Sequence, residues 1–429
     1  MSSIRLLSLV VLFSCCMALA VMGATEPEGQ DSTAGFIYGT VTWPSGETLT
    51  GFLRWEDEEA FWDDLFHSGQ RELPWFEYVD TDQLQAERRD AYYESHGLLH
   101  RLIYAMEEDG DFEPDWRVFL IRFGDIQSIE IHDGEDDFVI TADGSRHEVG
   151  GYANDAGSDL LIYHDDGEPR ETDWNDLVEI RFAPVPPGSP AYAERLHGLV
   201  ETGSGDFEGY IQWDKSENLS RDILSGNEDG QDHDIPMGEI RSIAKFERTS
   251  SEVMLRDGGV LVLGGTNDVN DHNRGIMVET VDRGKLTIPW RHFVKVTFSD
   301  DPGSGKGRES YDNEAPLAGT VVLTDGSQAS GRLVYDVDAA WNWCLFSGSD
   351  QGIEYDIPFA LVSVVTILPQ NRCRVQLRTG PVLELGESHD TGDGNAGILV
   401  FDDHATEPRH IPWSLVQEVR FDGMAEETH

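Results

Sequence analysis

The sequence is poor in positive charge. Lysine and arginine number 31 against 81 aspartate and glutamate residues in a chain of 429, so the formal charge is −50, and only five of the basic residues are lysine. A surface of this sign repels phosphate, which excludes nucleic acids and anionic membranes as partners and leaves basic ligands and cations. Because such a surface stays hydrated in high salt, the composition also favours a saline habitat.

Cysteine and long apolar runs are scarce as well. Outside the N-terminus no apolar run approaches the length that crosses a bilayer, so we expect no transmembrane segment and a soluble protein. Residues 1–24 match a signal peptide, with Arg5 as the basic start and residues 6–21 as the apolar stretch. The mature protein is therefore expected in the periplasm or outside the cell. Its two remaining cysteines, Cys344 and Cys373, either form a disulfide or stay as separate thiols.

Known catalytic motifs are missing too. The chain has no Gly-x-Ser-x-Gly, no His-Glu-x-x-His and no Cys-x-x-Cys, and residues 303–307 lack the spacing of a P-loop. These absences favour a non-enzymatic scaffold or binding protein of a bacterial envelope, whose partner is an envelope protein or a glycan. The alternative is a hydrolase of glycans or peptides that uses carboxylates at a seam between units, since the separation of two carboxylates is a property of the folded chain.

What the sequence does contain is internal repetition. The pattern Gly-x-Val-x-x that leads to Gly-x-x-x-Trp begins at Gly39, and closely similar patterns begin at Gly198 and Gly319. Each copy continues to a Ser-Gly pair, at 68, 225 and 347, and a second pattern follows that ends near Trp174, Trp290 or Trp413. We infer three repeats of two half-units each. The predicted bounds are 36–182 for repeat 1, 197–300 for repeat 2 and 316–423 for repeat 3, with linkers at 183–196 and 301–315.

Within each half-unit, apolar and polar residues alternate with the period of two that is typical of half-buried strands. About five strands fit in each half-unit, and a few residues, as in Pro412–Leu415, separate the last two. This pattern resembles small SH3-like or Sm-like barrels, in which a short 3₁₀ turn joins the last two strands. The resemblance implies an all-β chain of six tandem five-stranded barrel units. A six-bladed β-propeller is the alternative.

Repeat 1 contains an insertion at residues 75–118 that the other repeats lack. Apolar residues recur at helical spacing late in the segment 82–106, which predicts a helix. The insertion is either a cap on the open end of the repeat array or the place where a binding function was added.

Two loops are candidate calcium sites. Asp268, Asp271 and Asn273 in repeat 2 recur with equal spacing as Asp390, Asp393 and Asn395 in repeat 3, and a glycine follows two residues after each asparagine. Carboxylate and amide oxygens suit Ca²⁺, although the spacing is not that of an EF-hand. The alternative is a structural turn, because Asn and Asp bond their own backbone and tolerate left-handed conformations.

Tryptophan is the other candidate for ligand binding. Seven of the 11 Trp residues recur in register with an aromatic residue or with each other, and aromatic residues that recur in this way are more simply explained as core. The remaining four, which could stack on a sugar, are Trp43, Trp75, Trp116 and Trp343.

Overall fold

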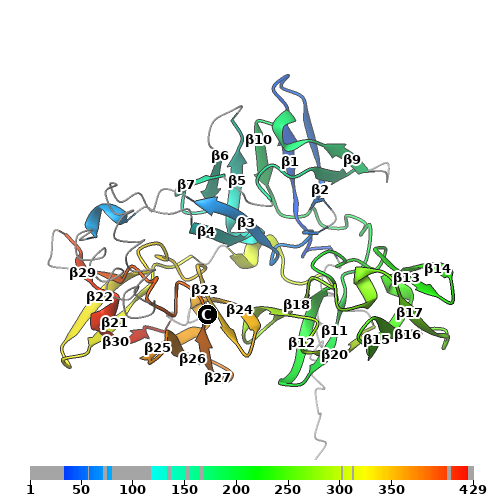
Figure 1. The fold of residues 1–429 in the computed structure, drawn as a ribbon. Helices are drawn as coiled ribbons and strands as arrows, with labels where there is room; N and C mark the ends of the chain where they lie inside the picture. Colours follow the sequence, from blue (N-terminus) through cyan, green and yellow to red (C-terminus); the bar gives the residue numbers. More distant parts are fainter. Residues whose placement is uncertain are drawn as a thin grey trace, which may run out of the picture. The chain divides into compact units, whose positions relative to one another are not determined.

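Buried and more exposed residues alternate along much of the chain, and these segments are the strands of an all-β protein. The structure is a computed structural model, and it describes residues 33–56, 58–70, 75–79, 117–132, 137–150, 155–164, 169–300, 303–311, 314–402 and 407–423 (Figure 1). These residues form 30 strands and eight short 3₁₀ turns, and none of them is in an α-helix. The predicted all-β class is therefore confirmed. No helix of the described residues is long and apolar enough to cross a membrane.

The strands of repeat 1 are β1 (Tyr38–Thr42), β2 (Thr48–Trp55), β3 (Leu65–Gln70), β4 (Arg117–Arg122), β5 (Ile126–Glu130), β6 (Asp137–Thr141), β7 (Arg146–Val149), β8 (Leu160–Tyr163), β9 (Pro169–Thr172) and β10 (Glu179–Phe182). Those of repeat 2 are β11 (His197–Thr202), β12 (Gly205–Gln212), β13 (Ile223–Glu228), β14 (Gln231–Pro236), β15 (Ile240–Glu247), β16 (Ser250–Leu255), β17 (Val260–Gly264), β18 (Ile276–Thr280), β19 (Gly284–Ile288) and β20 (Phe293–Phe298).

Those of repeat 3 are β21 (Ala318–Leu323), β22 (Gln328–Tyr335), β23 (Leu345–Asp350), β24 (Ile353–Pro358), β25 (Val362–Leu368), β26 (Arg372–Leu377), β27 (Val382–Gly386), β28 (Ile398–Phe401), β29 (Arg409–Ile411) and β30 (Val416–Phe421). The 3₁₀ turns are η1 (Phe76–Tyr78), η2 (Phe123–Asp125), η3 (Trp174–Asp176), η4 (Met237–Glu239), η5 (Asn267–Val269), η6 (Arg308–Tyr311), η7 (Phe359–Leu361) and η8 (Trp413–Leu415).

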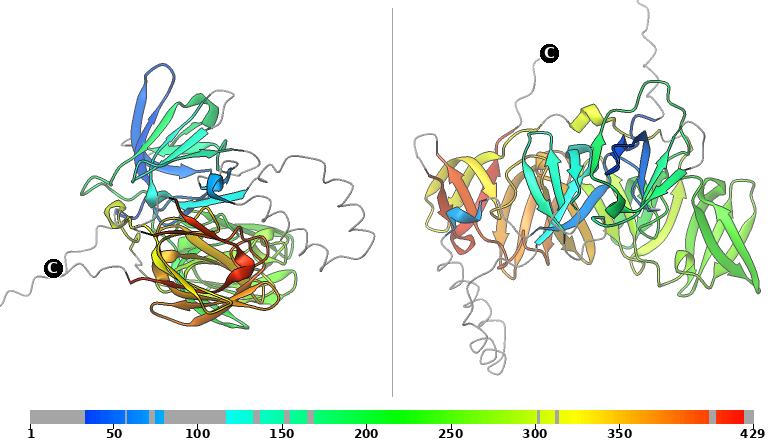
Figure 2. Two further views of the ribbon diagram at one scale, coloured as in Figure 1. Left: turned by 90° about the vertical axis from the view of Figure 1, so that its left-hand side faces the viewer. Right: turned by 90° about the horizontal axis from the view of Figure 1, so that it is seen from above.

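One antiparallel pairing scheme recurs in the three repeats. In repeat 1 the order is β7-β6-β5-β10-β1-β2-β8-β9, and β3 pairs with β4 beside it. In repeat 2, β15 pairs with β16 and β20, β20 with β11, β11 with β12, and β12 with β18, which are the equivalent strands. Repeat 3 pairs β25, β30, β21, β22 and β28 in the same way. Figure 2 shows the curved sheets that these strands form.

The pairing corrects the expected count of six separate barrels. The last strand of the second half-unit, β20, pairs with both β11 and β15 of the first half-unit, and β12 of the first pairs with β18 of the second. The two halves of a repeat therefore share strands. A propeller blade of four consecutive strands does not describe this exchange either.

Aromatic residues at equivalent positions fill the cores. Trp55, Trp213 and Tyr335 are 1%, 0% and 0% exposed, so the interpretation of recurring aromatic residues as core is confirmed for them. Repeats 2 and 3 share one hydrophobic cluster, because β19 of repeat 2 pairs with β24 of repeat 3. Repeat 1 meets repeat 2 through a small hydrophobic cluster that includes Phe61 and Leu219, and through buried ion pairs. These are Arg54–Asp222 at 2.8 Å, Arg195–Asp63 at 2.5 Å and Lys285–Asp64 at 3.0 Å.

Several sequence predictions fall on residues that the structure does not describe. The signal peptide at 1–24, the helix at 82–106 and Trp116 all lie outside the described residues. The repeat and linker bounds remain predictions. Cys344 and Cys373 are free thiols.

Candidate functional site

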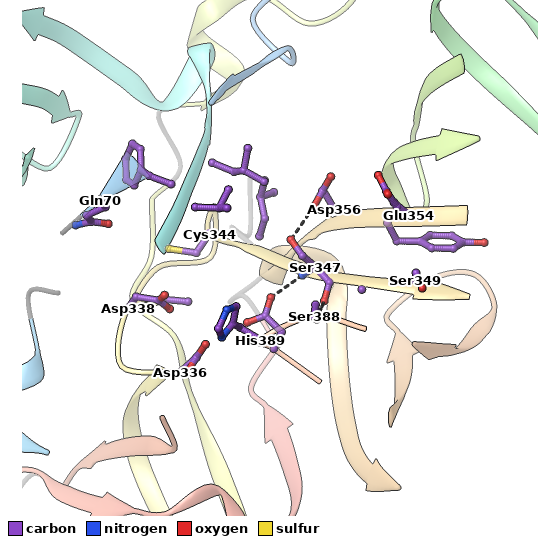
Figure 3. Close-up of a pocket in the computed structure, with 18 of the residues that line it drawn as sticks. Gln70, Asp336, Asp338, Cys344, Ser347, Ser349, Glu354, Asp356, Ser388 and His389 are labelled. Carbon is purple, nitrogen blue, oxygen red and sulfur yellow. Dashed lines mark hydrogen bonds between the residues drawn. The ribbon is translucent and has the colours of Figure 1, made fainter. Parts of the chain in front are cut away.

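A cavity of about 440 Å³ lies between repeat 1 and repeat 3 (Figure 3). We call it the seam cavity. Repeat 1 contributes the end of β3, the strand β4 and one residue of β7, and repeat 3 contributes β23, β24 and the loops that precede β23 and follow β27. Neither repeat has this cavity by itself, so the site depends on how residues more than 200 positions apart pack together.

The strand β4 lines the cavity with its edge. Val118, Phe119 and Leu120 all line it, although successive side chains of a strand point to opposite faces. The backbone between them must therefore face the cavity. Among the described strands β4 pairs with β3 alone, so its other edge has no strand partner there. Val118 is 67% exposed, so its side chain is open to contact at this wall.

Two side chains at the cavity have buried polar atoms without a hydrogen-bond partner among the described residues. Trp343 is 5% exposed, and its Nε1 is buried without such a bond. Both ring nitrogens of His147 are also buried without a bond there, and the two rings meet edge to face at 6.4 Å. Burial lowers the pKa of His147, so its ring is neutral at pH 7 and has one donor and one acceptor. Unpaired buried polar groups cost free energy, so this wall of the cavity is not optimised for stability.

The floor of the cavity is held by serine and carboxylate groups that bond each other. The Ser347 hydroxyl donates to Asp356 at 2.6 Å, and the Ser349 hydroxyl donates to Glu387 at 2.6 Å. The Ser388 hydroxyl donates to the Ser347 carbonyl at 2.6 Å. Figure 3 shows Ser347, Ser349, Ser388 and Asp356 on the repeat 3 side of the cavity. The serine hydroxyls are thus engaged in hydrogen bonds that hold the loops in place.

The cavity lacks the relay that would activate a nucleophile. Burial raises the pKa of the Cys344 thiol to about 12, so it is not a thiolate at neutral pH. His389 lies 3.4 Å from the Gly394 carbonyl oxygen, and His147 has no hydrogen-bond partner. Within the described part of the chain, neither histidine is seen to bond a serine or Cys344.

The charge of the lining selects the kind of ligand. Asp338, Glu354 and Glu387 contribute carboxylates, and no lysine or arginine is among the described residues that line the cavity. Anions would be repelled, whereas neutral or positively charged groups would be accepted.

Of the three candidate tryptophans that the structure describes, one meets this cavity. Trp343 lines it, but at 5% exposure its ring face is not open for stacking. Trp43 is 9% exposed and lies under the Arg170 guanidinium at 4.0 Å. Trp75 packs on Phe401 of repeat 3, with ring centroids 5.5 Å apart. Sequence reasoning missed β4 and His147. The sequence signal for β4 is the apolar run of residues 118–121, which breaks the alternation of a half-buried strand, and His147 has no such signal.

The two candidate calcium loops are built as turns. Asp268 and Asp390 accept hydrogen bonds from the backbone N–H groups of Ser225 and Ser347, at 2.6 and 2.7 Å. Asn273 and Asn395 accept from the N–H of the glycine two residues later, Gly275 and Gly397, at 3.0 and 2.8 Å.

The remaining two carboxylates of these loops are at the surface. Asp271 pairs with Arg248 at 2.5 Å, and Asp393 is exposed. In the described residues, no group of three or more His, Cys, Asp or Glu side chains is arranged to hold a metal ion. Calcium binding stays a prediction, and the turn accounts for the loops without it.

The structure also corrects the alignment of repeat 1. Asp155 accepts a hydrogen bond from the backbone N–H of His67, so Asp155 is the equivalent of Asp268 and Asp390. His67 therefore corresponds to Ser225, and the Ser68-Gly69 pair is displaced by one residue from the Ser-Gly pairs of the other repeats.

A second, smaller cavity of about 260 Å³ lies between repeats 1 and 2, and Glu56, Glu58, Glu59 and Asp155 line it. Burial and the neighbouring Asp155 raise the pKa of Glu59 well above its usual value, and burial raises the pKa of Asp155 to about 7. Arg274 of repeat 2 also lines this cavity and pairs with Glu58 at 3.0 Å.

Comparison with known proteins leaves the family open. No protein-family model matches the chain, and no curated protein matches its sequence. Among solved structures, one described as a streptogramin B lyase structure is 11% identical, and the match covers 70% of this chain and 94% of that chain. The TM-score is 0.11, which does not show a shared fold.

Proposed function

We propose that the protein is an exported, non-enzymatic binding protein of a bacterial envelope, and that its seam cavity holds an extended segment of a partner protein. The observation that carries the proposal is the β4 edge, which faces the cavity and has no strand partner among the described residues. An extended segment that added to β4 would gain main-chain hydrogen bonds from that edge. Its side chains would reach the apolar wall of Val118 and Leu120.

The described rings favour a protein over a glycan as the partner. Sugars stack on open aromatic faces, and Trp43, Trp75 and Trp343 are packed against other side chains or buried. The acidic lining further favours a segment that carries positive charge or none.

The hydrolase alternative concerns the second cavity. The raised pKa values of Glu59 and Asp155 resemble those of a catalytic carboxyl pair. However, Glu217 of repeat 2 is the equivalent of Glu59, and burial together with Asp268 raises its pKa to about 8 as well. A feature that recurs at equivalent positions follows from the fold, so we assign no reaction to this cavity.

For the architecture, we propose that each repeat is one folding unit made of two interlocked SH3-like halves. Short 3₁₀ turns precede the last strand of five of the six half-units, which supports the likeness, and strand exchange ties the halves together.

The test is a selection of peptides from a random display library on the full mature protein. We expect binders that lose at least tenfold in affinity on Val118→Asp, because a buried carboxylate would oppose the segment at the cavity wall. Val281→Asp is the matched control, since Val281 is 89% exposed in a hairpin away from the cavity. Equal binding by the two variants, or selection of glycans and not peptides in a parallel array, would overturn the proposal.

A further inference from the structure

The strands β4, β14 and β24 occupy the same place in the three repeats, and their outer edges differ. Each pairs in the same register with the strand before it. The outer edge of β24 is filled by β19, with Lys285 opposite Asp356, Leu286 opposite Tyr355 and Thr287 opposite Glu354. The protein thus contains one example of a strand added to this kind of edge.

The junction of β19 with β24 depends on close approach. Gly284 has φ +73°, and a Cβ at this position would overlap the Asp356 carbonyl oxygen, so the added strand needs glycine there. The next residue, Lys285, lies opposite Asp356 across the ladder, although its ammonium pairs with Asp64 of repeat 1 at 3.0 Å. Asp356 itself accepts a hydrogen bond from the Ser347 hydroxyl at 2.6 Å.

The strand β14 has an outer edge equivalent to that of β24, but no described strand pairs with it. Asp234 is the equivalent of Asp356, and it accepts a hydrogen bond from the Ser225 hydroxyl at 2.9 Å. Its carboxylate is exposed, as are Asp232 and Gln231. Among the described residues β14 pairs with β13 alone, at the margin of repeat 2 in Figure 1. None of its residues lines the seam cavity, so this edge is separate from the site described above.

We propose that the outer edge of β14 binds an extended peptide of a partner protein that carries Gly-Lys followed by two strand-forming residues. The peptide lies antiparallel to β14 with its lysine opposite Asp234, as Lys285 lies opposite Asp356. The exposed carboxylates of Asp232 and Asp234 favour the lysine, and the close approach to the Asp234 carbonyl selects the glycine.

A second copy of this chain fits the edge poorly. The hairpin strands equivalent to β19 are β9 and β29, and their last paired residues, Thr172 and Ile411, correspond to Ile288. Three residues earlier, where repeat 2 has Lys285, they have Pro169 and Pro408. Proline cannot donate a hydrogen bond to a strand ladder and carries no charge, so β9 and β29 are poorly suited to pair with the β14 edge.

The probe is a fluorescent peptide with the sequence of residues 282–289, titrated into the full mature protein at about 0.15 M salt to limit unspecific attraction. We expect saturable binding that weakens at least tenfold on Asp234→Asn, because a charge-assisted hydrogen bond is lost. Asp206→Asn, at an exposed position of the same repeat, has the same net charge and should bind like wild type. Replacing glycine by valine or lysine by alanine in the peptide should weaken binding equally strongly.

Pairing through the edge has a signature of its own. Only alternate N–H groups of an antiparallel strand point to one neighbour. Methylation of one alternating set of peptide nitrogens should therefore abolish binding, and methylation of the other set should spare it. No binding, equal binding to Asp234→Asn, or equal effects of both methylated sets would overturn the proposal. Peptide-independent dimerisation that Asp234→Asn abolishes would also overturn it, in favour of a second copy.

Discussion

At the scale of single residues, the recurring aspartates of this chain act as fasteners, by which we mean that each carboxylate ties its loop to a strand through a hydrogen bond. Asp268 and Asp390 lie in loops that the sequence offers as either calcium sites or turns, and each carboxylate holds the start of a strand some 43 residues away in the sequence. A turn at the Asp, Asn and Gly pattern could be predicted from the sequence. The backbone N–H group that each aspartate binds could not, because nearly every residue carries such a group and the sequence does not mark which one lies nearby.

Removing one of these fasteners should destabilise the protein. Asp268→Ala leaves the buried N–H of Ser225 without an acceptor, and we expect a loss of about 1 to 3 kcal/mol in the free energy of unfolding. Asp393→Ala is the control, since Asp393 is exposed and should change stability by less than about 0.5 kcal/mol. Urea denaturation of both variants measures the difference, and equal midpoints would contradict the fastener role.

Calcium should add nothing specific to these loops. Because Asp268, Asp390 and the amide oxygens of Asn273 and Asn395 already accept backbone hydrogen bonds, we expect Ca²⁺ and Mg²⁺ at equal ionic strength to shift the melting temperature equally, through screening alone. A calcium-specific increase that disappears in Asp268→Asn and Asp390→Asn would restore the calcium hypothesis.

For the recurring tryptophans, by contrast, the sequence alone was sufficient to predict a place in the core. Trp413 is 7% exposed and meets Tyr335 edge to face at 5.8 Å. We expect Trp413→Ala to cost about 3 to 5 kcal/mol, as for other large buried aromatic residues. Chemical denaturation tests this, and an unchanged midpoint would mean that the residue does not belong to the core.

At the scale of elements, strands were predictable and their partners were not. Alternation shows which side chains of Val375–Leu377 face the core, and β26 is a strand there. It says nothing of the pairing between β20 and β11, which are nearly 100 residues apart and join the two half-units of repeat 2. The count of six barrels failed for this reason, because it assumed that sequence neighbours close on themselves.

The junction between repeats 2 and 3 offers a direct test at this scale. Gly284→Ala places a Cβ against the Asp356 carbonyl at a positive φ, and we expect a loss of about 2 to 5 kcal/mol in the free energy of unfolding. The matched control is Gly258→Ala, where φ is +94° but nothing lies near the new Cβ, so that only the backbone cost of about 1 to 2 kcal/mol remains. Equal losses in the two variants would show that close approach at β19 is unimportant.

At the scale of the whole molecule, the sites arise from the packing of repeats. The seam cavity joins β4 of repeat 1 to β23 and β24 of repeat 3, and its residues carry no shared motif. Sequence reasoning placed one of its residues, Trp343, among the candidates, and did so by elimination. The net charge of −50 is visible in the sequence, but the burial of particular acids between repeats is not.

These buried acids predict how stability depends on pH. Burial and the neighbouring Asp268 raise the pKa of Glu217 to about 8, and burial and the neighbouring Asp63 raise that of Glu279 to about 8. In the unfolded chain both groups ionise near pH 4.3. Between pH 7 and 8.5 the folded state therefore holds protons that the unfolded state has lost, and stability must fall as the pH rises. Each group contributes at most about 1.4 kcal/mol per pH unit.

Between pH 7 and 8.5 His147 contributes little to the pH dependence, because burial lowers its pKa and its ring is mostly neutral in both the folded and the unfolded state. Glu217→Gln cannot ionise, so we expect it to remove part of the slope, whereas Glu208→Gln, at an exposed position, should keep it. Urea titrations at pH 7.0, 7.5, 8.0 and 8.5 measure the slopes. About 1 M NaCl shortens the Debye length to about 3 Å, which suppresses the general repulsion of so acidic a surface. If stability at high salt is independent of pH, or if both variants keep the full slope, Glu217 is ionised in the folded protein.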